Sequence, residues 1–531
     1  MGSISRCDRD THERGATRGA TPQRACAFGH HTTEIIGICG QFRVAHSGVR
    51  AGGRASYDAR MNLEDNRRSP RRHALRTRAP WFAAVLGLSV ACAEGTSRYE
   101  DRDAGGGIIT GNGDAFDTGT VSGSDNWPDF EPYDIAEAGW TFETVATEPE
   151  AVRGDATLAF TQGGIAEVAW SELDPSDNGV GSRNIWLASR VVTEWSADMH
   201  TDDDGTLYFA PNLAADDEVL HLAYHGSPDT TRDVYFAERT IAGWTETNLS
   251  SNVDGSDPRA CGDPEVLAHP DAGPHVAYIS APASDSGSRD GPYEVRVVDA
   301  SNPSTPDVRH TINPPDDHPL GCEEFAAAVG PDGDLHVVAS CRPDEVLYAS
   351  NASGAWQEST LALGGDSRAE TPALAFDHAG ETLHIAYMRR HACSDDDSGC
   401  STIYHRRLDV ATESLSSDTE VSDAPDRAAR RPAVTVDPQS RVLIAYESDG
   451  RGGSSDPDSD IRLAWSDDDG GSFAPRVTIS PDRDSGVTDS RPTAFQLHPQ
   501  TGLPHLAIQT NHYLGDGGLA VDIAHGYLEP R

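Results

Sequence analysis

The sequence predicts an all-β fold built from repeated four-stranded units, and three observations carry this prediction. A short apolar phrase returns seven times between residues 166 and 508. The segments around it are rich in turn formers, with 51 glycines and 33 prolines in the 531-residue chain. No segment shows the apolar period of an amphipathic helix. Repeats of this length indicate one repeat architecture rather than several unrelated domains.

The recurring phrase is predicted to be the second strand of each unit. Successive copies lie 48 to 62 residues apart when they are aligned on their fourth letter. The copies are AEVAW (166–170), LHLAY (220–224), PHVAY (274–278), LHVVA (335–339), LHIAY (383–387), VLIAY (442–446) and PHLAI (504–508).

Three further strands surround the phrase in each unit. A first strand such as PALAF (372–376) precedes it across a tight turn, and a third strand such as DVYFAE (233–238) follows a polar loop. A fourth strand often opens with an aromatic residue, as in GWTETNL (243–249). Four short strands with such turns are typical of a β-propeller blade, so we predict a seven-bladed β-propeller over residues 133–531.

The seventh unit ends in LAVDIAHGYLEPR and has no fourth strand of its own. The segment AGWTFETVATE (138–148) closely matches AGWTETNLSS (242–251), which contains a fourth strand. We therefore expect the N-terminal strand to complete the last blade and close the ring, because closure removes free sheet edges.

Residues 61–92 are predicted to be a processing segment. Arginines precede a short apolar run, Trp81 to Ala91, which is too short to span a bilayer comfortably and ends at Cys92. Small residues before a cysteine resemble a bacterial lipoprotein signal, which implies lipidation of Cys92. We then expect an exported protein held at a membrane by its lipid alone, in the periplasm or at the cell surface. The alternative is a cytosolic protein with a basic tail.

The segments on either side of this signal are not predicted to fold. Residues 1–60 show no periodicity and are read as a disordered upstream extension or a misassigned start, with Met61 as the other start. Residues 93–132 are rich in Gly, Asp, Ser and Thr, as in a flexible tether.

The charge of the chain is strongly negative and unevenly spread. The formal net charge is −43, and the 42 basic residues are all arginine. Residues 1–91 hold 15 arginines against 7 acidic residues, so the remainder carries −51. Such a body is soluble and self-repelling, and it excludes electrostatic binding of nucleic acid. We expect a monomer.

Three acidic loops are candidates for binding calcium. They are SDDDSG (394–399), SDPDSD (455–460) and Asp467 to Asp469. Ca²⁺ prefers several oxygens in a rigid loop, but Ile461 stands where an EF-hand loop would need glycine. A solvated acidic surface is the default interpretation, calcium is the one cofactor these loops could hold, and no metal ligand is assigned.

The stretch WSDDDGGSF (465–473) has a defined spacing, S-x-D-x-G-x-S-F, given by Ser466, Asp468, Gly470, Ser472 and Phe473. Asp468 can accept backbone N–H groups within a turn, and Gly470 can take a positive φ. This spacing resembles the Asp-box of sialidase-like (BNR-repeat) β-propellers. The resemblance implies a structural hairpin between the third and fourth strands of the sixth blade.

The same resemblance implies an activity less firmly than a fold. Sialidases carry an arginine triad, a tyrosine–glutamate nucleophile pair and an aspartate acid/base, usually on six blades. RRP (430–432) and SRP (490–492) resemble the arginine–proline signature of that family. Two arginines are placed in this way, whereas the third arginine and the tyrosine are not, so the catalytic residues stay unknown.

A ring of residues is predicted at one mouth of the propeller channel, where the innermost strands begin. Counting back from each second strand gives Asp155, Ala210, Asp263, Glu324, Thr371, Arg431 and Arg491. Three carboxylates would face two neighbouring arginines. The ring is either a ligand site or a self-neutralised plug in which the arginines pair with Asp155 or Glu324.

Histidine and cysteine are predicted to have structural roles. His221, His275, His336, His384 and His505 occupy one position in five different blades, so they cannot converge on one metal ion and should be buried hydrogen-bonding groups. We expect disulfides Cys393–Cys400 and Cys322–Cys341, with Cys261 as a competitor for Cys341.

Three functions are compatible with these observations. The first is an exported, lipid-anchored propeller that binds a glycan or a surface protein without catalysis. The second is a sialidase-like glycoside hydrolase acting on acidic sugars. The third is a purely structural module of the cell envelope.

Overall fold

The computed structural model describes residues 133–529 apart from short internal gaps, and the statements below concern these residues. The gaps are 136–137, 147–152, 162, 174–181, 202–205, 217–218, 228–231, 255–258, 283–291, 314–320, 342–344, 363–368, 392–399, 423–427, 450–458, 475, 481–486 and 514–518. The predicted upstream extension, signal with Cys92, and tether lie outside them. None of the described helices is both long and apolar enough to cross a membrane.

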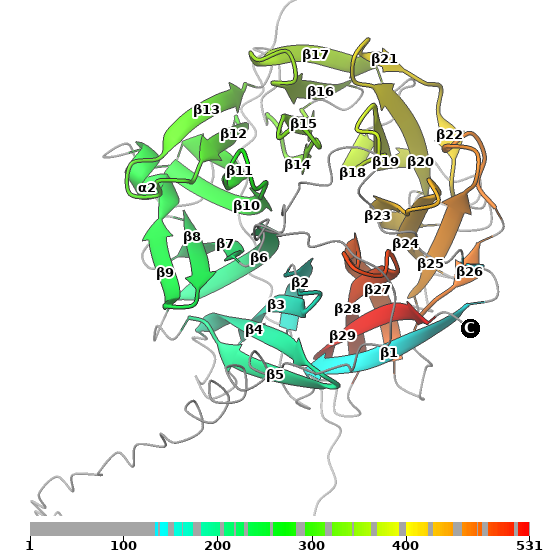
Figure 1. Cartoon of the computed structure of the whole chain (residues 1–531), viewed down its shortest axis with the longest axis horizontal. Coiled ribbons are helices and arrows are strands. Elements are labelled where there is room, and N and C mark those ends of the chain that lie inside the picture. The colour runs from blue at the N-terminus through cyan, green and yellow to red at the C-terminus, as the bar shows by residue number, and fades with distance from the viewer. Residues whose placement is uncertain are drawn as a thin grey trace, which may run out of the picture. The chain divides into compact units, whose positions relative to one another are not determined.

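The described chain is almost entirely antiparallel β-sheet, and one strand of each unit lies nearest the centre of the arrangement (Figure 1). These innermost strands are β2 Arg153–Phe160, β6 Leu207–Asp216, β10 Arg259–Leu267, β14 Glu324–Val329, β18 Ala369–Phe376, β23 Ala429–Val436 and β27 Val487–Leu497.

The recurring apolar phrase forms the second strand of each unit, as predicted. These strands are β3 Ala166–Leu173, β7 Val219–Ser227, β11 His275–Pro282, β15 Leu335–Ser340, β19 Thr382–His391, β24 Val442–Asp449 and β28 Pro504–Tyr513. Each pairs antiparallel with the innermost strand before it and with the strand after it.

The third strands lie further out. They are β4 Arg183–Val191, β8 Asp233–Thr240, β12 Glu294–Asp299, β16 Glu345–Ser350, β20 Cys400–Asp409, β25 Ser459–Ser466 and β29 Leu519–Glu529.

The outermost strands vary most in length. They are β5 Glu194–Met199, β9 Gly243–Asn248, β13 Asp307–Ile312, β17 Gln357–Ala362, the split pair β21 Ser414–Leu415 and β22 Thr419–Glu420, and β26 Val477–Thr478. A six-residue helix that the sequence pattern did not predict, α2 Leu249–Asp254, follows β9.

The N-terminal strand β1, Gly139–Ala146, pairs antiparallel with β29 at the other end of the chain. Trp140 lies opposite Leu528, and Phe142 lies opposite Gly526. β1 therefore occupies the outer position beside β29 that β9 and β17 occupy in their own sheets.

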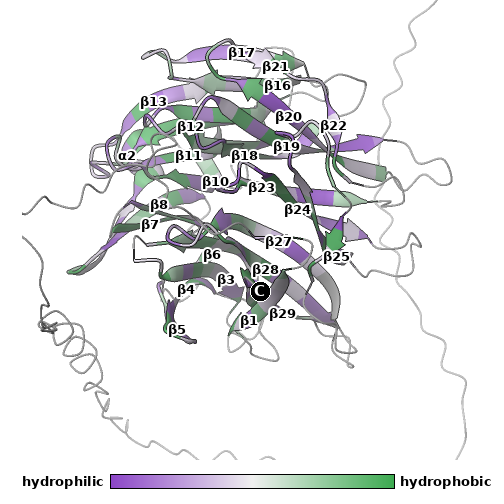
Figure 2. Ribbon diagram, turned by 45° about the vertical axis from the view of Figure 1, so that its right-hand side comes forward, coloured by the Kyte–Doolittle hydropathy of each residue, from purple (hydrophilic) through white to green (hydrophobic). Residues whose placement is uncertain are grey.

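The core consists of apolar layers on both faces of the sheets, and β11 illustrates the reason. Because side chains alternate across a strand, Val276 and Tyr278 pack toward the unit of β6–β9, while Ala277 and Ile279 pack toward the unit of β14–β17. All four are buried, and fully burying a large apolar side chain stabilises a fold by about 1.5–3 kcal/mol. Figure 2 shows hydrophobic stretches along the strands and hydrophilic residues in many turns.

Candidate functional site

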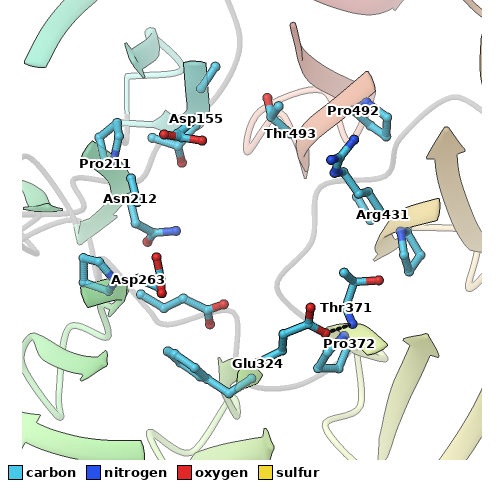
Figure 3. A pocket seen from close by; sticks show the side chains of 18 of the residues that line it. Asp155, Pro211, Asn212, Asp263, Glu324, Thr371, Pro372, Arg431, Pro492 and Thr493 are labelled. Carbon is cyan, nitrogen blue, oxygen red and sulfur yellow. Dashed lines mark hydrogen bonds between the residues drawn. The ribbon is translucent and has the colours of Figure 1, made fainter. Parts of the chain in front are cut away.

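A cavity of about 590 Å³ lies between the innermost strands, close to where they begin (Figure 3). Every residue that the sequence predicted for the ring at the channel mouth lines it. These residues are Asp155, Ala210, Asp263, Glu324, Thr371, Arg431 and Arg491. The sequence therefore identified which side chains come together, although not what they do.

The backbone at this cavity has an unusual conformation in several units. The φ angle lies between 46° and 55° at Asp155, Ala210, Asp263, Thr371 and Arg431. In each case the pairing with the second strand shifts register there, which marks a β-bulge. Such a φ costs a residue with a side chain about 1–2 kcal/mol. Bulges redirect side chains, and backbone strain of this kind clusters at functional sites.

The charged side chains divide the cavity into two halves. Asp155, Asp263 and Glu324 surround one half, and Arg431 faces them from the other (Figure 3). Glu323 and Glu265 add two further carboxyl groups to the lining. The cavity is therefore polar and mainly acidic, with its positive charge confined to the β23–β27 side.

The two arginines are held by second-strand residues of their own units. Arg431 Nη1 forms an ion pair with Glu447, whose side chain is 3% exposed, while the Arg431 side chain is 45% exposed. Arg491 Nη2 donates a hydrogen bond to Gln509 Oε1. The alternative in which Arg431 pairs with Asp155 or Glu324 is therefore wrong, because the buried Glu447 carboxylate holds this guanidinium instead.

Two of the acidic ring members also have defined partners. Glu324 Oε2 accepts the backbone N–H of Thr371 at 2.5 Å, which connects β14 to β18 (Figure 3). Asp155 Oδ2 accepts a long hydrogen bond of 3.4 Å from Ser171, whose hydroxyl also accepts one from Arg183.

Side chains two residues after the ring position connect consecutive units. In each case a side-chain oxygen accepts a backbone N–H of the next innermost strand. The acceptor–donor pairs are Thr157 with Leu213, Asn212 with Val266, and Glu265 with Ala327, at 3.4, 2.8 and 2.6 Å.

Glu265 also lines the cavity, and it was not among the residues predicted for the ring. Burial raises the pKa of Glu265 to about 8, against the opposing effect of the Ala327 N–H. A carboxyl group with this pKa is mostly protonated at pH 7. The sequence does show an acidic residue two positions after the predicted ring residue Asp263. It does not show that the side chain of Glu265 is buried, and burial causes the raised pKa.

The turn of WSDDDGGSF is organised around Asp468. Its Oδ1 accepts hydrogen bonds from Ser466 Oγ at 2.7 Å and from the Ser472 N–H at 2.8 Å. These hydroxyl and N–H donors hold the pKa of Asp468 at about 2. Gly470 has a φ of 76°, and Phe473 packs against the apolar layer between β18–β22 and β23–β26.

The five repeated histidines are buried, and each has a protein partner. The nearest polar partners are Asp216 for His221, the Gly273 carbonyl for His275, Asp334 and Tyr348 for His336, His405 for His384, and His525 for His505. Among the described residues, no group of three or more His, Cys, Asp or Glu could hold a metal ion. The acidic loop 394–399, Asp456 and Asp458 lie outside these residues.

The cysteines of the described region follow one of the predicted pairings. Cys322 and Cys341 form a disulfide, and the buried Cys261 thiol lies 3.6 Å from Ser280 Oγ. Cys400 is disulfide-bonded, while its predicted partner Cys393 lies outside the described residues.

Comparisons with known proteins add little. No family model and no curated protein matches the chain. A protein of unknown function from Dyadobacter fermentans is similar over 73% of this chain and 98% of its own, with 10% identity and a TM-score of 0.39. NanB sialidase from Streptococcus pneumoniae is similar over 73% of this chain and 70% of its own, with 9% identity and a TM-score of 0.40.

A lectin from Aleuria aurantia with a six-bladed β-propeller fold is also similar. The match covers 65% of this chain and 100% of the lectin, with 11% identity and a TM-score of 0.35. The strand pairing of the chain itself defines the fold.

Proposed function

We propose that this chain is an exported, lipid-anchored β-propeller of seven blades that binds a glycan with an acidic group in its central cavity, without catalysis. The pairing of β1 with β29 supports ring closure by the N-terminal strand. The grouping of the other strands around a common centre supports the blade count (Figure 1).

The observation that carries the proposal is the cavity lined by every innermost strand. Its carboxylates can accept hydrogen bonds from sugar hydroxyl groups. Arg431 uses Nη1 for Glu447 and is half exposed, so its other N–H groups are available to an anionic substituent. The acidic surroundings repel anions at long range, which favours an acidic group on a larger, mostly neutral saccharide.

A binding measurement on the full chain tests this proposal. Glycan-array binding should be strongest for saccharides carrying a carboxylate or sulfate, and Arg431→Ala with Arg491→Ala should abolish it in a chain that is still folded, as circular dichroism checks. Arg309→Ala is the matched control, because Arg309 is an exposed arginine paired with Asp299 and Asp307 outside the cavity. Loss of stability without any effect on binding would identify the ring as a plug.

Glycoside hydrolysis is the second candidate function, and one observation favours it. The cavity contains a carboxyl group with a raised pKa, Glu265, together with Asp263 and Glu324, and glycosidases use an acid and a carboxylate in such a pair. Release of 4-methylumbelliferone from its glucuronide or N-acetylneuraminide by the wild-type chain, but not by Glu265→Gln, would favour hydrolysis over binding.

Lipid anchoring is a separate part of the proposal and rests on the apolar run that ends at Cys92. Intact-mass analysis of membrane-extracted protein should show a diacyl or triacyl adduct on a chain that begins at Cys92. A soluble product that retains residues 1–91 would contradict it.

A further inference from the structure

Glu265 has a fixed position in the cavity wall with part of its carboxyl group left unused. It stands two residues after Asp263 on β10, beyond the bulge at Pro264. Its Oε2 accepts the Ala327 N–H of β14 at 2.6 Å, so the next unit holds the side chain in place. No hydrogen bond to Oε1 is made by the described residues, and the residue lines the cavity.

The connection between units does not explain why this residue is an acid. Thr157 and Asn212 occupy the equivalent position in the two preceding units, and they accept the corresponding N–H groups with neutral side chains. A glutamine at position 265 could do the same. Accepting the Ala327 N–H therefore does not require a carboxyl group at position 265.

Burial favours the neutral form of Glu265. The acidic groups nearby are Asp263 on its own strand, and Glu323 and Glu324 at the start of β14. His225 of β7 accepts the Asp263 N–H at 3.3 Å, and Asp155, Arg431 and Arg491 line the cavity on other strands. Burial raises the pKa of Glu265 to about 8. At pH 7 the group can therefore donate a hydrogen bond from the oxygen that does not accept the Ala327 N–H.

We infer that Glu265 is a specificity-determining residue of the cavity, which donates a hydrogen bond from its carboxylic acid to an acceptor oxygen of the bound glycan. This inference rests on the proposed function and names the group that recognises an acceptor on the ligand. A carboxylate can only accept hydrogen bonds, whereas a carboxylic acid at Glu265 gives this half of the cavity a donor. A ligand that places no acceptor oxygen at this point would leave that donor unmatched.

Calorimetric titration of the full chain with N-acetylneuraminic acid and with D-glucuronic acid tests the inference. The carboxyl groups of both sugars keep their charge between pH 7 and pH 9. Wild-type affinity should fall about tenfold over this range, as the neutral fraction of a group with a pKa near 8 falls from about 0.9 to about 0.1. Glu265→Gln keeps a donor and an acceptor at every pH, so its affinity should match the wild type at pH 7 and stay level to pH 9.

The remaining outcomes separate the inference from the function on which it rests. Glu265→Ala should bind more weakly than the wild type at pH 7. If the wild type binds with a level pH profile, or Glu265→Gln weakens with pH as the wild type does, the role of Glu265 is wrong while the site stands. If the wild type binds neither sugar at millimolar concentration, both are wrong. The melting temperature of Glu265→Gln checks that the connection to Ala327 is intact.

Discussion

Gly470 of the β23–β26 unit packs closely against His405 of the preceding unit. Its φ of 76° lies in the left-handed region, and a Cβ placed on it would be 2.0 Å from Cε1 of His405. His405 belongs to β20 and is buried. Its ring packs edge-on against the ring of Phe473, with the two ring centroids 5.3 Å apart. Gly470 therefore serves the contact between units as well as the turn.

We expect Gly470→Ala to destabilise the fold by about 2–4 kcal/mol. The left-handed φ accounts for about 1 kcal/mol and the clash with His405 for about 1–3 kcal/mol. Gly354→Ala is the matched control, because Gly354 has a φ of 82° but nothing within 4 Å of the added Cβ. Thermal or denaturant unfolding measures both, and an equal loss in the two variants would contradict the clash.

Two buried histidine pairs make stability depend on pH. His384 Nδ1 lies 3.0 Å from His405 Nε2, and His505 Nδ1 lies 2.8 Å from His525 Nε2. Burial lowers the pKa of His384 to about 4, of His405 to about 3 and of His525 to about 4, and it lowers that of His505 as well. In the folded protein these rings therefore stay neutral at pH values where an unfolded chain would protonate them.

We expect the free energy of unfolding to fall as pH drops from about 6.5 toward 4, because the unfolded chain then binds more protons. The slope can reach about 1.4 kcal/mol per pH unit for each proton taken up. Denaturant unfolding at pH 7, 6 and 5 measures it. His384→Gln with His405→Gln should reduce the slope, whereas His391→Gln, at an exposed position, should not. A level profile in the wild type would contradict the prediction.

At the scale of the strand, the bulges of the innermost strands place residues with a strained backbone at the wall of the cavity. Ala210 has a φ of 46°, although alanine gains nothing from this conformation. It lines the cavity on β6, before Pro211, and the pairing of β6 with β7 shifts register at this point. The bulge therefore belongs to the architecture of the cavity rather than to the chemistry of one side chain.

We expect Ala210→Gly to stabilise the fold by up to about 1.5 kcal/mol. Relief of the left-handed strain, about 1–2 kcal/mol, exceeds the backbone entropy cost of glycine, about 0.5–1 kcal/mol. Ala214→Gly is the control in the same strand, because Ala214 has no positive φ and should lose stability. Melting temperatures that fall in both variants would show that the bulge is unstrained.

The order of strands could be predicted from the sequence because each unit repeats the same apolar phrase. LHIAY and VLIAY lie within β19 and β24, and the match between the Trp140 and Trp244 segments identified the strand that pairs with β29. The ring positions followed by counting along strands, since strand geometry is regular. The position of a residue along its strand can therefore be predicted from local sequence alone.

The partners of the site residues could not be predicted in the same way. Glu447 and Gln509 hold the arginines from neighbouring strands, and the raised pKa of Glu265 depends on its burial in the folded protein. Such properties arise from three-dimensional neighbours. The helix α2 was missed because six residues are too few to show a period.

At the scale of the whole described region, β1 brings the two ends of the fold into one sheet. Trp140 and Phe142 of β1 pack against the apolar layer that contains Leu506, Ile508 and Phe495. Glu143 forms an ion pair with Arg190 of the first unit at 2.5 Å, so β1 contacts both the last unit and the first.

Deleting residues 133–148 should lower the melting temperature markedly. The deletion exposes the edge of β29 and removes three partly buried aromatic side chains, Tyr133, Trp140 and Phe142, that pack against one apolar layer. Truncation of a fully buried aromatic residue costs about 3–5 kcal/mol, and the loss here comes from three partly buried rings together. A synthetic peptide of residues 133–148 added in trans should restore part of the loss. An unchanged melting temperature would mean that β29 does not depend on β1.

The pairing of β1 with β29 also has a mechanical consequence. Tension applied to the chain upstream of Tyr133 first loads the contacts of Tyr133 with Asp437 and Arg441, and then the hydrogen bonds between these two strands. While they hold, the pull is shared with the rest of the sheet through β28 and β27. If β1 peels away, the Glu143–Arg190 ion pair breaks with it, and the load passes along the backbone directly to β2, at the wall of the cavity. As long as β1 stays paired with β29, a pull from upstream does not reach the innermost strands through the backbone that follows β1.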